Sequence, residues 1–145
     1  MLSVYAQDRQ TCDSIYLKTD KLIKTDDPCL LIGTDYILAH PLFGNPDQYH
    51  QYMRFVMTWM EKTPDYTFSL NDKIMALCKD DNILLFNVYL SCLAKAAIEE
   101  KKANSDKAVK LFAEYLKRPE NKVKQLSKIK KLIKDVENGQ LEKYL

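Results

Sequence analysis

Residues 82–102 read NILLFNVYLSCLAKAAIEEKK, the longest apolar helical pattern in the chain. Apolar side chains recur every three or four residues, which is the spacing of an α-helix rather than of a strand. Small side chains at Ala94 and Ala97 allow a neighbouring helix to approach closely. The segment therefore predicts a long helix that packs on several sides. Its main apolar stripe consists of Leu85, Val88, Tyr89, Cys92 and Ala96.

Helical spacing continues on both sides of this segment. Towards the N-terminus it predicts helices over 8–24, from Pro28 to before His40, from Pro46 to about residue 63, and a short one after a cap at 69–72. Towards the C-terminus it predicts helices over 105–118 and 120–138, the last closed by Gly139. No segment alternates as a strand would. We therefore predict one all-α domain over 1–145, with six or seven packed antiparallel helices, bundle-like or forming a short α-superhelix.

The composition fits a single folded domain. The chain has 145 residues, of which 46% are hydrophobic, enough to fold around a core without a metal or disulfide. Its apolar runs are much shorter than the ~20 residues of a membrane-spanning helix, so no transmembrane span is expected. The formal net charge of +2 does not imply a polyanionic partner.

The first residues resemble the end of a secretory signal peptide. Val4 and Ala6 place small residues three positions before, and directly before, a cleavage point at polar Gln7. Residues 1–6 are therefore interpreted as the remnant of a signal peptide, which favours a periplasmic or secreted protein. The alternative is an ordinary N-terminus of a cytoplasmic protein.

The four cysteines bear on the same question. In an oxidising compartment the pairs closest in sequence are Cys12–Cys29 and Cys78–Cys92, one of three complete pairings. The alternative is four buried free thiols that pack as small apolar side chains. The chain has no Cys-x-x-Cys spacing, so neither a redox motif nor a zinc site is expected.

Signatures of catalysis are missing from the sequence. It contains no Gly-x-Ser-x-Gly, no phosphate-binding glycine loop, no His-Glu-x-x-His and no dinucleotide fingerprint. We therefore predict a non-enzymatic protein with no catalytic residues, no metal and no cofactor. The alternative is an enzyme whose reactive groups would be Cys78, Cys92, His40 and His50.

One part of the chain resembles a known repeat. Residues 87–97, a break, then Ala108-x-x-x-Phe112 and a closing Pro119 are similar to one tetratricopeptide-type helical hairpin. The resemblance covers residues 87–119, and no second copy follows at a period of 34 residues. It implies an antiparallel helical hairpin, a unit that in such families presents a surface to a protein or peptide.

Aromatic and methionine side chains gather in residues 49–60 and in the segments on either side of them. Such side chains are enriched in protein interfaces, so they predict a groove for a protein or peptide partner. The alternative is that residues 49–60 form a buried central helix. The candidate partner-binding residues are Phe43, Tyr49, Tyr52, Trp59, Tyr66 and Phe68.

The most basic segment is 117–134, where eight basic residues and one acid give a net charge of +7. Lys124, Lys128 and Lys131 are the candidate residues of a basic face that binds an anionic polymer or a membrane surface. The alternative is a solvated outer face of a packed helix. A nucleic acid is not expected as a partner, because this segment contains a single arginine, Arg118, and no aromatic residue. Oligomeric state is left open by the sequence.

Overall fold

The computed structural model describes residues 27–41 and 46–145, and within them every regular element is helical. The all-α prediction is therefore confirmed, while the predicted helix over 8–24 lies outside the described residues. The helices are α2 (Asp27–Ala39), α3 (Pro46–Lys62), α4 (Asp72–Leu77), α5 (Leu85–Glu100), α6 (Ser105–Lys117) and α7 (Ser127–Glu137). In the same described ranges, the 3-10 helices η2 (Asp80–Asn82) and η3 (Pro119–Asn121) lie between these helices, and η4 (Glu142–Tyr144) follows α7.

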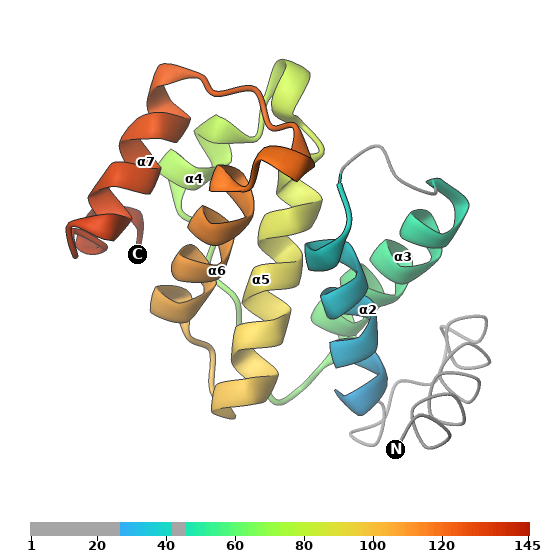
Figure 1. Cartoon of the computed structure of the whole chain (residues 1–145). Helices are drawn as coiled ribbons and strands as arrows, with labels where there is room; N and C mark the ends of the chain where they lie inside the picture. Colours follow the sequence, from blue (N-terminus) through green and yellow to red (C-terminus); the bar gives the residue numbers. More distant parts are fainter. Residues whose placement is uncertain (1–26, 42–45) are drawn as a thin grey trace, which may run out of the picture.

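Helix α5 lies at the centre of the fold (Figure 1). It packs against α2, α3 and α6, and its residues Val88, Cys92, Ala94 and Ala96 are fully buried. The alanines bring backbones close together, and the larger apolar side chains fill the space on the other faces. The long apolar pattern at 82–102 thus corresponds to the central helix, although α5 itself begins only at Leu85, after η2.

Helices α5 and α6 lie side by side and antiparallel across a short connection (Figure 1). Helix α5 ends at Lys101, which adopts a left-handed conformation with φ of 57°. Helix α6 starts at the cap Asn104, whose side-chain oxygen accepts a hydrogen bond from the Lys107 amide at 3.0 Å. The α5–α6 pair is a helical hairpin, and its likeness to a tetratricopeptide unit stays a prediction.

The last helix begins later than predicted. The sequence indicated a helix over 120–138, but the chain forms η3, then a non-helical segment, and α7 starts at Ser127. Lys122 turns left-handed with φ of 53°, and Asn121 donates a buried hydrogen bond to the carbonyl of Tyr115 at 2.8 Å. Gln125 satisfies the carbonyl of Leu116 at 3.0 Å, so side chains replace helical hydrogen bonds here.

Candidate functional site

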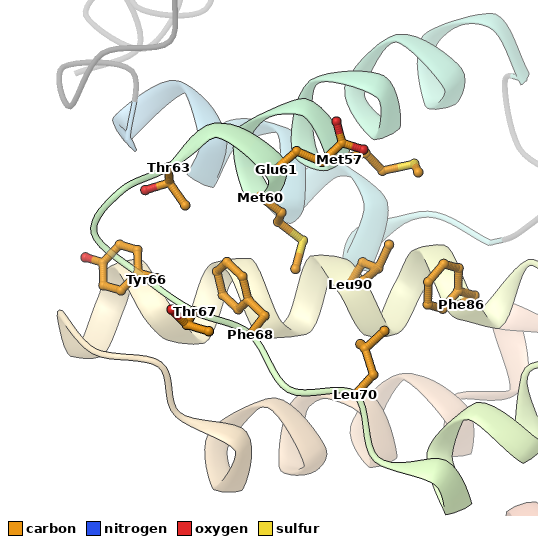
Figure 2. Close-up of a pocket in the computed structure, with 10 residues that line it drawn as sticks. All are labelled: Met57, Met60, Glu61, Thr63, Tyr66, Thr67, Phe68, Leu70, Phe86 and Leu90. Atoms are coloured by element: carbon orange, nitrogen blue, oxygen red, sulfur yellow. The ribbon is translucent and has the colours of Figure 1, made fainter.

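An open pocket of about 460 Å³ lies where α3 ends (Figure 2). One side is α3, the floor is α5, and the other side is residues 63–71, which join α3 to α4 and are here called the crossing segment. The volume is within the range of about 300–1,000 Å³ that is typical of ligand sites. The lining residues are Met57, Met60, Glu61, Thr63, Tyr66, Thr67, Phe68, Leu70, Phe86 and Leu90.

The crossing segment is positioned by aromatic packing. Pro64 stops α3 from continuing, because proline lacks the N–H that a helix interior needs. Beyond it, the ring centroids of Tyr66 and Phe68 lie 5.8 and 6.0 Å from the ring centroid of the buried Trp59, and 6.4 Å from each other. Asn71 then caps α4 by accepting hydrogen bonds from two backbone amides at 2.9 and 3.3 Å. The segment is thus fixed at its aromatic side chains and at its end.

The pocket exposes apolar side chains to solvent. Met57 is 39% exposed and Leu70 is 45% exposed, and they lie on the α3 side and the crossing-segment side of the pocket (Figure 2). Half-buried Phe68 and Phe86 continue the apolar lining below them. Within the described part of the chain, Glu61 is the charged residue of the lining, and it is exposed and forms no ion pair. The site is therefore apolar with one acidic group on its α3 side.

The structure divides the predicted partner-binding residues into two groups. Tyr66 and Phe68 line the pocket, whereas Trp59 is buried behind them. Tyr49 and Tyr52 are core residues of α3, as the alternative interpretation held, and a partner could not reach them without unfolding the helix. Phe43 lies outside the described residues.

Most of the remaining lining was not identified from the sequence. Met57 belongs to the methionine-rich pattern of 49–60, which indicated the helix but not which side chains stay accessible. Leu70, Phe86 and Leu90 join the site only because a non-helical segment crosses α5. Helical spacing carries no information about where such a segment runs.

The predicted basic face is not one helix face. Lys124 lies in the non-helical segment before α7, and Lys128 is exposed on α7. The Lys131 ammonium lies 3.0 Å from the Asp135 carboxylate, which Lys143 also approaches at 3.6 Å. The basic residues of 117–134 therefore do not form one continuous positive surface. The non-helical segment before α7 separates Lys124 from the helix, and Asp135 neutralises the charge of Lys131.

The cysteines behave in two ways. Cys78 and Cys92 are buried free thiols, so the pairing of these two that sequence proximity suggested does not form. Burial raises the pKa of Cys78 to about 12 and also raises that of Cys92. Cys29 is disulfide-bonded, and the remaining cysteine, Cys12, lies outside the described residues.

Residues 27–41 and 46–145 contain neither a metal cluster nor a membrane-spanning helix. In these ranges no group of three or more histidine, cysteine, aspartate or glutamate side chains could hold a metal ion. None of the described helices is both long enough and apolar enough to span a membrane.

No family model matches the chain, and neither a curated protein nor a solved structure is significantly similar to it.

Proposed function

We propose that this protein is a non-enzymatic module that binds a segment of another protein in the pocket between α3, the crossing segment and α5. The observation that carries the proposal is the pair of exposed apolar side chains, Met57 and Leu70, above a half-buried aromatic floor. Large apolar side chains clustered at a concave opening mark interaction sites more often than isolated ones do. Methionine adds adaptability, since its flexible side chain can repack against different partners.

The lining also defines the chemistry of the partner. Apolar side chains of the bound segment would displace water from Leu70, Phe68 and Leu90. The Glu61 carboxylate, which forms no ion pair with any described residue, favours a partner with a lysine or arginine at the edge of its apolar residues. The partner we propose is thus a polypeptide segment with two or more apolar side chains and a neighbouring positive charge.

Selection from a phage-displayed library of random dodecapeptides tests this function. We expect peptides with apolar residues and a basic residue to be enriched on the wild-type protein. Leu70→Gln should weaken their binding about fivefold, because roughly half of a leucine's burial energy is lost. The matched control is Leu126→Gln, since Leu126 is 44% exposed and lies outside the pocket. Failure to enrich peptides, or equal losses in both variants, would contradict the proposal.

A second candidate is an anionic membrane surface that contacts α7. It is favoured by Lys128, Lys130 and Lys134, which are exposed and form no ion pair within the described part of the chain, and by the exposed side chain of Leu126. Cosedimentation with phosphatidylcholine vesicles, with and without phosphatidylserine, tests it. Binding should require phosphatidylserine, fall steeply with salt and be lost on charge reversal of Lys128, Lys130 and Lys134. A binding curve without salt dependence would end this candidate.

We also propose an extracytoplasmic location, on the strength of the Val4-Tyr5-Ala6 pattern. The intact mass of the protein from its native source tests this directly. A mature chain that begins at Gln7 supports export, whereas a chain that retains Leu2 and Ser3 contradicts it.

A further inference from the structure

We infer that the bound polypeptide lies in the pocket as an extended strand, hydrogen-bonded to the backbone of residues 67–70. The inference rests on the proposed function and specifies the form of its ligand. Addition of a strand to an exposed backbone edge is one established mode of peptide recognition, and insertion of a helix into an apolar groove is another. Three features of the crossing segment favour the strand.

The first feature is the unused hydrogen-bonding capacity of the segment. In the described structure, the backbone N–H and C=O groups of residues 67–70 form no hydrogen bond with any protein group. The segments on either side differ, since Thr63 donates to the carbonyl of Trp59 at 2.9 Å and Asn71 caps α4. Four consecutive residues beside an apolar pocket thus present backbone donors and acceptors that have no partner among the described protein groups.

The second feature is the alternation of side chains. Tyr66, Phe68 and Leu70 all line the pocket. The residues between them, Thr67 and Ser69, are polar and more exposed than Tyr66 and Phe68, although Thr67 also borders the pocket. A period of two is the geometry of a strand, in which successive side chains point to opposite faces. The exposure of successive side chains from Tyr66 to Ser69 thus alternates as it does in a strand, and four residues of an extended strand span about 13 Å.

The third feature is the support beneath the segment. A two-stranded ribbon alone in water is marginal, but packing against a helix stabilises it. Here α5 supplies that surface through Phe86 and Leu90, with Met60 from α3 beside them (Figure 2). A strand added along the free backbone edge of the crossing segment would place alternate side chains against this apolar surface and leave the others in solvent. A bound helix would fill the apolar space and leave the backbone groups of 67–70 without a protein partner.

Residue-resolved amide hydrogen exchange distinguishes these modes. The probe is a synthetic copy of a dodecapeptide enriched on the wild-type protein and weakened by Leu70→Gln. In the free protein the amides of residues 67–70 should exchange without protection. With the peptide bound, alternate amides of this segment should slow by about tenfold or more, while those between them stay fast.

A scan of single N-methylated residues along the same peptide provides the second readout. Strand pairing predicts that methylation weakens binding about tenfold at every second residue and little in between. Exchange at 67–70 that is unchanged by the peptide, together with helical circular dichroism gained on binding, would overturn the strand and leave the proposed function intact. A library that yields no peptide sensitive to Leu70→Gln would overturn both.

Discussion

Replacing Trp59 by alanine tests whether aromatic packing holds the crossing segment against the helices. The indole of Trp59 is 2% exposed and packs on the rings of Tyr66 and Phe68. Truncation of a buried tryptophan or phenylalanine costs about 3–5 kcal/mol, because packing is lost and a cavity remains. That is a large share of the ~5–15 kcal/mol that stabilises a typical domain.

The assay is urea unfolding followed by far-UV circular dichroism, since Trp59 is the single tryptophan and the variant lacks its fluorescence. With a slope of ~2 kcal/mol per molar urea, the midpoint should fall by about 1.5–2.5 M. The matched control is Met57→Ala on the same helix, which removes a side chain that is already 39% exposed and should cost less than ~1 kcal/mol.

A double-mutant cycle then isolates the contact that fixes the crossing segment. The single variants Trp59→Leu and Phe68→Leu are compared with the double variant. Aromatic pairs at this separation contribute about 0.5–1.5 kcal/mol beyond their burial, so the two substitutions should couple by that amount. A midpoint shift no larger than that of Met57→Ala, or coupling indistinguishable from zero, would refute the packing on which the pocket depends.

Three further predictions concern the rest of the fold. The Tyr144 hydroxyl donates a hydrogen bond to the buried Asp135 carboxylate at 2.7 Å and lowers the pKa of Asp135 below its ordinary value of 3.8. The ionised Asp135 carboxylate therefore stabilises the fold above pH 3.8, and this stabilisation is lost as the pH falls through the lowered pKa. As the pH is lowered from about 5, the melting temperature should therefore fall less in Tyr144→Phe than in the wild type. An equal fall of the melting temperature in both proteins would count against the contact. Cys78 and Cys92 are buried thiols with raised pKa values. Mass spectrometry should therefore find that iodoacetamide alkylates neither of them at neutral pH until urea is added. Rapid alkylation in the native protein would contradict their burial. Gly139 has a φ of 75°, and no atom outside its chain neighbours lies within 4 Å of the position that an added Cβ would take. Gly139→Ala should therefore lower the free energy of unfolding by about 1 kcal/mol through backbone strain alone. Thermal melts that show a stabilised variant would refute this prediction.

The helices could be predicted from the sequence because their patterns depend on local chemistry. The stripe through Leu85, Val88 and Cys92 identified the central helix, and Gly139 correctly marked the end of α7. The stretch 120–126 was predicted wrongly because its residues are compatible with a helix by themselves. Their conformation is set by Asn121 and Gln125, which bond to carbonyls at the end of α6. Those partners become known only once the helices are packed.

The candidate site was partly predictable for the same reason. Tyr66 and Phe68 were predicted as aromatic residues in a segment beside 49–60, and both line the pocket. Tyr49 and Tyr52 shared the aromatic pattern but are buried, since the periodicity of a helix shows that one face packs without showing against which neighbour. Leu70 and Phe86 carry no such pattern, and their meeting depends on the path of the crossing segment.

The path of that segment explains why an open site exists here. Helix α5 is covered by α2, α3 and α6 on its other sides, and a further helix over Phe86 and Leu90 would have satisfied its own backbone and closed the surface. Pro64 ends α3 instead, and the chain continues to α4 without regular structure. Because the backbone of residues 67–70 has no hydrogen-bond partner within the described part of the chain, it must remain accessible to water or to a ligand. The apolar pocket and the backbone beside it are therefore exposed for the same structural reason. A ligand that covers the apolar side chains and also hydrogen-bonds to this backbone would gain more binding free energy than a ligand that does only one of these.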